Sequence, residues 1–416
     1  MMNMKVGRSR TERISGTTCA YWLAGRCNRN PCRFLHTETS YPSTASYHNA
    51  RKFHSFSKFE KSRPKHNPNT ILNRNSEKTQ VADKSSPSIC KYWVNGNCVH
   101  GDRCRYLHRW SYGDGFATLT KLQGHKKLVT GIVLPVGSDK LYSGSTDGTL
   151  RTWDCNSGQC TNLMNLGAEA TSLISEGPWI FVGLTKAVMA WNIQTASHFT
   201  LDGPKGRILA MTVGNDTLFA GAEDGIISAW RGSSTADSPF ELVASLCDHT
   251  KSVVCLAVGG DKMLCSGSKD QSIKVWDLDT LECKMTLNAH TDAVTSLIWW
   301  DNYLLSGSSD CTIHVWAATE ERTLKVIYSH NVESDVVALS GMADPEAKPI
   351  LLCSCTDNSV RLYELPSFAE RGRLFAKKEV GSFETGPGGL FFTGDRTGLL
   401  MVWKWLEEPR VEAASS

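Results

Sequence analysis

The pattern of hydrophobic and polar positions in this chain changes near residue 116. From there onward, short runs of strand-forming residues are bounded by Gly, Ser and Asp, which is typical of short strands joined by tight turns. A late aromatic residue recurs at intervals of roughly 40 residues, a spacing found in repeat proteins. The recurring aromatics are Trp153, Trp191, Trp230, Trp276, Trp316, Tyr363 and Trp403. This pattern predicts a mainly β protein with seven similar units.

Two further markers accompany these aromatics. A Ser-Gly-Ser-x-Asp turn stands before the aromatic of several units, beginning at Ser143, Ser266 and Ser306. A His precedes the turn in several units, at His125, His249, His290 and His330. With these markers the chain resembles WD-repeat β-propellers, in which each repeat forms one blade of four strands. The resemblance implies a seven-bladed propeller over residues 116–416.

The resemblance also implies how a blade is held together. In the family, a His, a strand Ser, a turn Asp and a Trp form hydrogen bonds in series. The matching sets are His125, Ser143, Asp147 and Trp153; His249, Ser266, Asp270 and Trp276; and His290, Ser306, Asp310 and Trp316. The second unit has Thr185 in place of the Asp and no His, the third keeps Asp224 without a His, and the seventh has Thr397. We expect packing alone to hold those three blades.

The ring is expected to close through the two ends of the repeat region. The run Phe116–Leu122 precedes the first marker His, and Trp403 belongs to the third strand of the last unit. If Phe116–Leu122 supplies the missing outer strand of that unit, no unpaired edge remains at the seam.

Residues 1–115 carry two copies of a different pattern, made of potential metal ligands. The ligands are Cys19, Cys27, Cys32 and His36 in the first copy, and Cys90, Cys98, Cys104 and His108 in the second. Both copies share Cys-x-Tyr-Trp-x-x-Gly-x-Cys. Three thiolates and one imidazole form a tetrahedral ligand set typical of structural zinc. The spacing therefore predicts two CCCH zinc fingers, in residues 13–40 and 84–111, and two Zn²⁺ ions. His100 lies inside the second copy, but the spacing from Cys104 favours His108 as the ligand.

The charge of the chain is unevenly distributed. Residues 1–115 hold 20 Lys and Arg against 7 Asp and Glu, whereas the remainder holds 25 against 35. A basic arm joined to an acidic body predicts a polyanionic partner for the arm. Residues 41–83 between the fingers are polar and basic with few aliphatics, so we expect a disordered basic linker.

Aromatic and basic side chains in the fingers are candidates for contacts with nucleic acid. They are Tyr21, Arg26, Arg29, Arg33 and Phe34 in the first finger, and Lys91, Tyr92, Arg103, Arg105 and Tyr106 in the second. Aromatic rings can stack on unpaired bases, and Arg can contact phosphate or stack. Trp22 and Trp93 are expected to form the small cores around zinc. Tristetraprolin-type fingers also place an aromatic two residues after the second Cys, where this chain has Arg29 and His100. No base preference is therefore carried over from them.

The whole chain resembles the plant family that joins CCCH fingers to a WD-repeat propeller. The resemblance implies a non-enzymatic adaptor whose fingers bind single-stranded RNA in preference to DNA and whose propeller docks an unknown protein partner. One alternative is a DNA-binding transcription regulator, although no recognition helix is evident. Another is a substrate receptor of a cullin-type ubiquitin ligase, although Asn156 and Asp279 stand where such receptors carry an Arg. The marker His and Asp follow the blade period, and neither a phosphate loop nor a nucleophile elbow occurs, which argues against an enzyme.

The composition also bears on location. No apolar run approaches the ~20 residues needed to cross a bilayer, and the basic N-terminus lacks the apolar stretch of a secretory signal. Ligand thiols must stay reduced to bind zinc, which indicates a reducing compartment. We expect a monomer with no membrane partner, located in the nucleus or shared between nucleus and cytoplasm.

Overall fold

The computed structural model describes residues 88–113, 115–233, 239–260, 262–320 and 323–406, together with two short strands near the N-terminus. The chain divides into two compact units, Met1–Glu77 and Lys78–Ser416. In the first unit, β1 (Ser15–Thr18) and β2 (Phe34–Leu35) pair in parallel. The ligands predicted for the first finger and the predicted linker 41–83 lie outside the described residues.

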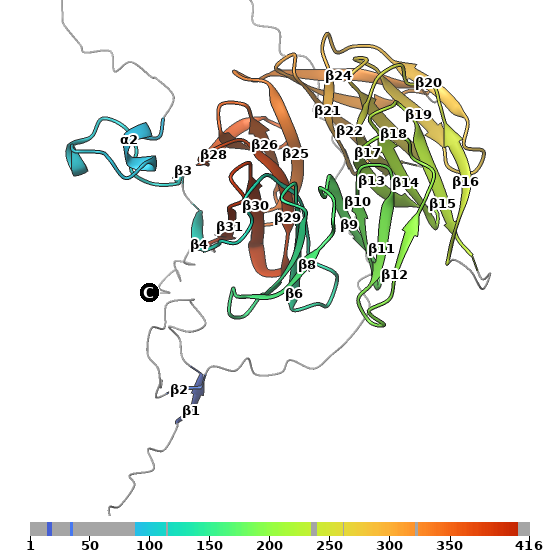
Figure 1. The fold of residues 1–416 in the computed structure, drawn as a ribbon. Helices are drawn as coiled ribbons and strands as arrows, with labels where there is room; N and C mark the ends of the chain where they lie inside the picture. The colour runs from blue at the N-terminus through green and yellow to red at the C-terminus, as the bar shows by residue number, and fades with distance from the viewer. Residues whose placement is uncertain are drawn as a thin grey trace, which may run out of the picture. The chain divides into compact units, whose positions relative to one another are not determined.

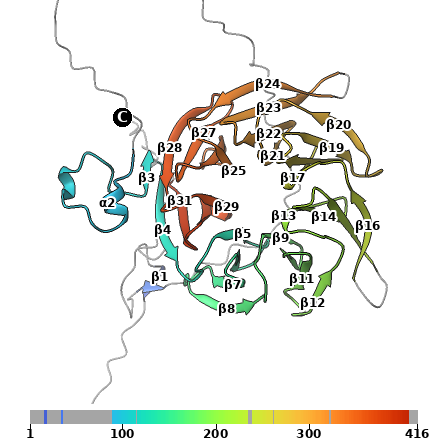
Figure 2. The same cartoon turned by 45° about the horizontal axis from the view of Figure 1, so that its top comes forward.

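The second unit contains seven antiparallel sheets arranged around a central axis (Figures 1 and 2), as the sequence predicts. Blade one consists of β5 (Val129–Val133), β6 (Lys140–Ser145), β7 (Thr149–Asp154) and β8 (Cys160–Asn165). Blade two consists of β9 (Ser172–Glu176), β10 (Trp179–Gly183), β11 (Val188–Asn192) and β12 (His198–Leu201). Blade three consists of β13 (Ile208–Gly214), β14 (Thr217–Ala222), β15 (Ile227–Gly232) and β16 (Phe240–Leu246).

The remaining blades repeat this order. Blade four consists of β17 (Val253–Gly259), β18 (Met263–Ser268), β19 (Ile273–Asp277) and β20 (Cys283–Leu287). Blade five consists of β21 (Val294–Trp300), β22 (Tyr303–Ser308), β23 (Thr312–Ala318) and β24 (Leu324–Asn331). Blade six contains β25 (Val336–Ala343), β26 (Pro349–Cys355), β27 (Ser359–Glu364) and β28 (Ala369–Phe375). Blade seven contains β29 (Val380–Thr385), β30 (Leu390–Asp395) and β31 (Leu400–Trp405), with the short helix η2 (Pro387–Gly389) between β29 and β30.

Hydrophobic side chains fill the spaces between neighbouring blades. Leu305 of blade five, for example, packs in one buried cluster with Val336 and Leu351 of blade six. Gly307, the middle residue of Ser306-Gly307-Ser308 in β22, allows blades five and six to approach each other closely. A Cβ on Gly307 would lie 2.6 Å from a methyl carbon of Val336, so a larger residue there would push the two blades apart.

The expected closure of the ring is confirmed. Strand β4 (Phe116–Leu122) pairs antiparallel with β31, with Thr118 opposite Trp403. The outer strand of blade seven therefore precedes blade one in the chain, and the seam is held by backbone hydrogen bonds. Among the described residues, no helix has the length and apolar character needed to cross a bilayer.

The three expected hydrogen-bonded sets are also confirmed. In blade one, Ser143 Oγ lies 2.8 Å from both Trp153 Nε1 and His125 Nε2, while His125 Nδ1 lies 3.2 Å from Asp147 Oδ2. Blades four and five repeat this arrangement with their own His, Ser, Asp and Trp. Because a carboxylate only accepts hydrogen bonds, the ring proton of a neutral His belongs on Nδ1.

One expectation about the divergent blades is wrong. In blade seven the indole Nε1 of Trp403 donates to Thr393 Oγ1 at 3.0 Å, so this blade keeps part of the series instead of relying on packing alone. Thr393 occupies the place of the Ser and supplies the same hydroxyl. Blade three uses a weaker substitute, in which Trp230 Nε1 donates to the backbone carbonyl of Asp202 at 3.4 Å.

Candidate zinc site and nucleic-acid interface

The second cysteine-rich segment forms a small knot held by its backbone. Helix α2 (Lys91–Val94) begins at Cys90, whose Sγ accepts a hydrogen bond from the backbone N–H of Trp93 at 3.4 Å. The 3₁₀ helix η1 (Gly101–Arg103) then leads into Cys104. The N–H of Cys90 donates to the carbonyl of Leu107 at 2.9 Å. This contact brings the beginning of the segment next to its end.

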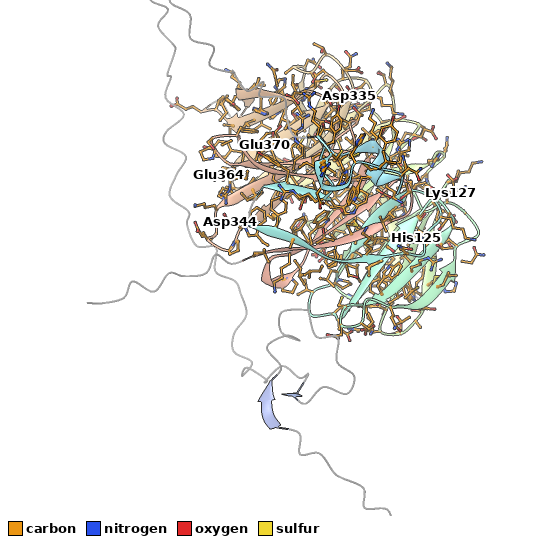
Figure 3. All side chains as sticks on the ribbon, turned by 90° about the vertical axis from the view of Figure 1, so that its left-hand side faces the viewer. His125, Lys127, Asp335, Asp344, Glu364 and Glu370 are labelled. Carbon is orange, nitrogen blue, oxygen red and sulfur yellow. The ribbon has the colours of Figure 1, made fainter. Side chains whose placement is uncertain are left out.

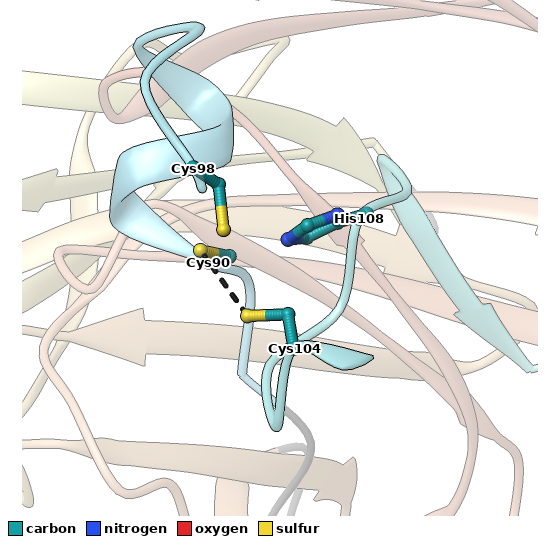
Figure 4. A group of neighbouring side chains, drawn as sticks. All are labelled: Cys90, Cys98, Cys104 and His108. Carbon is teal, nitrogen blue, oxygen red and sulfur yellow. Dashed lines mark hydrogen bonds between the residues drawn. The ribbon is translucent and has the colours of Figure 1, made fainter. Parts of the chain in front are cut away.

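Four potential ligands meet in this knot. One ligand atom from each of Cys90, Cys98, Cys104 and His108 lies within 4.8 Å of every other (Figure 4). The Sγ atoms of Cys90 and Cys104 are 3.7 Å apart. A tetrahedron with Zn–S bonds of ~2.3 Å has S–S edges of ~3.8 Å, so this spacing suits zinc. The three cysteines are free thiols.

The imidazole of His108 provides an independent test of this fit. Its Nε2 atom is buried and has no hydrogen-bond partner among the described residues. A buried polar atom without a partner is costly, and a bound metal would remove that cost. His100, in contrast, is exposed at the start of η1 and is not part of the cluster. The donor set therefore fits zinc, with His108 as its nitrogen ligand.

The thiols are electrostatically prepared for a cation. Burial acts to raise the pKa of Cys90, but the hydrogen bond from the Trp93 amide and the neighbouring polar side chains of the cluster lower this pKa to about 7. The amide of Tyr106 acts to lower the pKa of Cys104, but burial and the negative charge of Cys90 raise it overall. The Cys90 thiol therefore loses its proton more readily than a free cysteine, and zinc binds the thiolate form.

The structure places the predicted nucleic-acid contacts of this finger on its surface. Tyr92 and Tyr106 expose 69% and 52% of their surface, and Lys91, Arg103 and Arg105 are also exposed. Trp93 instead turns inward and stacks on His108, with ring centroids 5.7 Å apart and an interplanar angle of 9°. The candidates of the first finger, Tyr21, Arg26, Arg29 and Arg33, lie outside the described residues. Phe34 lies in β2, and only its backbone is described.

The attachment of this finger to the propeller was not predicted. Strand β3 (Ser111–Gly113) pairs with β28 as a fifth strand of blade six, so little flexible chain separates finger from propeller. The carbonyl of Trp110 accepts a hydrogen bond from the N–H of Phe375 at 2.8 Å. The Trp110 side chain packs against the core shared by blades six and seven. The sequence feature that could have indicated this attachment is Trp110, which lies two residues after the candidate ligand His108.

Gly113 shows why β3 can lie so close to blade six. Its φ of +101° is a conformation that side chains disfavour, and a Cβ there would lie 2.6 Å from the carbonyl oxygen of Arg371. In blade seven, Lys121 of β4 holds its Nζ 4.7 Å from the centre of the Trp110 ring. The finger is therefore anchored to blade six through β28 and to blade seven through β4.

Comparison with known proteins supports both parts of the molecule. A family model described as a zinc finger domain matches residues 90–108, and a WD domain, G-beta repeat, matches residues 116–154. A model described as an IP5P C-F beta-propeller matches residues 194–344.

Similar sequences are found in plants. The chain is 48% identical to zinc finger CCCH domain-containing protein 17 of Oryza sativa subsp. japonica, covering 94% of this chain and 92% of that protein. It is 50% identical to zinc finger CCCH domain-containing protein 48 of Arabidopsis thaliana, covering 94% and 91%. Among solved structures, the WD40 beta propeller domain of Doa1 superposes with a TM-score of 0.60 at 20% identity, over 72% of this chain and 99% of that one. This last likeness concerns the fold alone.

Proposed function

We propose a function from the premise that this chain belongs to the plant family that joins CCCH zinc fingers to a WD-repeat propeller. The combination supports an adaptor that binds nucleic acid through its fingers and protein through its propeller. Our specific proposal is that the fingers bind single-stranded RNA and that the propeller docks a protein partner without catalysing a reaction. We further propose that the protein acts as a monomer in the nucleus or in both nucleus and cytoplasm.

The zinc content is part of this proposal. The cluster of Cys90, Cys98, Cys104 and His108 would hold one ion. Cys19, Cys27, Cys32 and His36 repeat the ligand types with nearly the same spacing and would hold a second. Zinc would supply the cross-link that keeps so short a segment folded, because the finger buries too little apolar surface to fold alone.

The exposure of Tyr92 and Tyr106 is the observation that carries the RNA proposal. Two large rings, 69% and 52% exposed, lie on the surface of the knot, which also exposes Lys91, Arg103 and Arg105. An unpaired base can stack on such a ring while a nearby cation contacts its phosphate. Helix α2, with 4 residues, is too short to read a duplex major groove as a recognition helix does.

The His residues of the propeller support a role without catalysis. His125, His249 and His290 are buried, and each is engaged by a Ser and an Asp of its own blade. Burial lowers the pKa of all three, so they remain neutral near pH 7. They hold blades together and present no acid or base to a substrate.

A binding experiment with the zinc-loaded full chain tests the RNA proposal. Fluorescence anisotropy would compare single-stranded RNA with duplex DNA of the same length at equal salt. Tyr106→Ala and Phe34→Ala should each weaken RNA binding by about 1–3 kcal/mol, or about 5- to 150-fold. Tyr106→Phe is the matched control, because it keeps the ring and should bind like the natural protein. Zinc content is measured in every variant, since an unfolded finger would imitate lost stacking. Tighter binding to duplex DNA would favour the transcription-regulator alternative instead.

A further inference from the structure

We propose that the nucleic-acid surface of the second finger continues onto the propeller, along a basic arc on blades seven, one and two. The arc comprises Lys377, Lys378, Arg396, Lys126, Lys127, Lys186, Lys205 and Arg207. It would contact the phosphates of a single strand already held by the finger. This inference rests on the proposed RNA binding of the finger, and adds a second contact surface to it.

The arc begins where the finger is anchored. Trp110, which leads out of the finger, lines the same narrow cavity as Ala376 and Lys377 at the start of blade seven. Because β3 and the Trp110 carbonyl bind β28, the finger is held beside this point. Lys377 and Lys378 are exposed beside this point, on the loop that joins blades six and seven.

Contacts between loops continue the arc into blade one. The N–H of Arg396 donates to the carbonyl of Glu379 at 3.0 Å, and their side chains form an ion pair at 2.8 Å. In the same turn, Gly398 approaches the next loop so closely that a Cβ would lie 2.9 Å from the carbonyl oxygen of Lys127. The loop carrying Lys126 and Lys127 therefore lies directly against the turn that carries Arg396.

A shared carboxylate links blade one to blade two. Glu169 lies 4.0 Å from Lys127 Nζ and 3.0 Å from an Arg207 guanidinium nitrogen. The loop that ends at Arg207 also carries Lys205, which is exposed. Lys186 is exposed on the neighbouring turn of blade two. The basic side chains thus follow one end of blades seven, one and two, as far as the loop that leads into blade three.

The arc remains positive after its own acidic residues are counted. Its loops and turns carry eight Lys and Arg against five carboxylates: the surface groups of Glu169, Asp202 and Glu379, the partly buried group of Asp147 and the buried group of Asp395. Asp147 accepts hydrogen bonds from His125, Thr149 and the Lys126 amide and keeps its negative charge. The arc ends at blade three, where the N–H of Glu223 donates to the carbonyl of Arg207 at 2.9 Å and the same turn exposes Glu223 and Asp224. No ion pair forms at Lys126, Lys377 or Lys378 within the described part of the chain. The net negative charge of the propeller therefore conceals a local positive surface.

The same end of blades four to six has the opposite character. Its loops expose Asp248, Asp292, Glu333 and Asp357 against Lys251 and Lys269, and Asp335 is partly exposed. The opposite ends of the blade-six strands are also acidic. Figure 3 shows Asp344, Glu364 and Glu370 on one side of the propeller and His125 and Lys127 on the other. A phosphate chain would thus be attracted to the arc and repelled beyond it. The arc offers charge and no base-reading geometry, so we expect it to add affinity without sequence preference.

Paired charge-removal variants test the arc in the zinc-loaded full chain. Lys377→Gln with Lys378→Gln removes two cations from the arc. The control, Lys251→Gln with Lys269→Gln, removes two exposed cations from blade four and causes the same change in net charge. The probes are a 30-nucleotide oligouridylate and a short one of about 6 nucleotides, a length that one small module can cover.

The arc variant should bind the long RNA about three- to tenfold more weakly. Its salt slope should fall by about 1.4, because a single strand contributes roughly 0.7 per phosphate contact. Binding of the short RNA should be unchanged, and the control variant should match the natural protein with both probes. Unchanged melting temperatures would exclude unfolding as the cause.

Distinct outcomes separate this inference from the proposed function. If the arc variant binds the long RNA as the natural protein does while Tyr106→Ala weakens both probes, the arc proposal is overturned and the finger proposal stands. If the natural protein binds neither RNA, both fail. If the arc variant loses binding only to an acidic peptide, the arc serves a protein partner and the RNA proposal for it is wrong.

Discussion

The indole ring of Trp110 lies 5.1 Å from that of Trp93, and this contact joins the zinc knot to the propeller. On one side Trp93 stacks on the zinc-ligand candidate His108, and on the other Trp110 packs against the core of blades six and seven. The finger and the ring are thus parts of one packed structure. Substitution of either Trp should therefore change the stability of both the finger and the propeller.

Trp110→Ala should loosen the finger from the propeller. Large-to-small changes at fully buried aromatic positions cost about 3–5 kcal/mol, and the partial burial of Trp110 suggests the lower end of that range or less. The midpoint of urea unfolding, followed by circular dichroism, should fall accordingly. Proteolysis between residues 109 and 116 should become faster. Trp110→Phe should recover most of the loss, whereas equal proteolysis of all three proteins would show that the anchor is unimportant.

Zinc removal should unfold the fingers and leave the propeller folded. The sets of hydrogen bonds in blades one, four and five contain no metal, so a chelator should not change the β signal of the propeller. Native mass spectrometry should show two zinc ions per chain, with one lost in Cys98→Ser and another in Cys27→Ser. Cys160→Ser, on an exposed strand of blade one, is the matched control and should retain both. Zinc retained by the double ligand variant would contradict the assignment.

Acid should weaken the propeller through its buried His residues. Burial lowers the pKa of His249 in the folded state, so the unfolded chain binds the proton more readily. Stability is therefore lost as the pH falls below about 6.5, the unfolded value, and the loss continues to the lower folded pKa. The carboxyl of Asp270, with its pKa lowered to about 2, adds a second loss below about pH 4.

The melting temperature measured from pH 7.5 to pH 5 should reveal the His contribution. His249→Asn should melt lower at pH 7.5 but with a flatter pH dependence than the natural protein. Glu384 acts in the opposite sense, because burial raises its pKa to about 7. Comparing each variant with the natural protein removes that background. Parallel pH profiles would show that His249 titrates alike in both states.

The repeat and its chemistry could be found in the sequence because each blade uses the same residues at the same intervals. The same hydrogen-bonding residues recur once in each of several repeats. Their order in the chain was therefore enough to assign His125, Ser143, Asp147 and Trp153 to one set by resemblance to the WD repeat. The role of Thr393 was missed because its unit lacks the turn Asp, although a Thr hydroxyl can replace that of Ser. Strand β3 could not be found this way. Its three residues have no alternation, and they pair only because β28 offers a free edge beside the seam.

The seam itself allows a graded test of closure. A fragment of residues 109–416 keeps Trp110, β3 and β4, and should be nearly as stable as the full chain. A fragment of residues 116–416 keeps β4 but loses the β28–β3 pairing and the Trp110 packing, so it should melt lower while remaining folded. A fragment of residues 125–416 also loses β4, which exposes the edge of β31 and uncovers Trp403 and Trp405. An exposed apolar edge strand promotes aggregation, so this last fragment should aggregate or melt far earlier. Light scattering and thermal melts would rank the three fragments, and equal stability of the last two would show that β4 does not hold the ring closed.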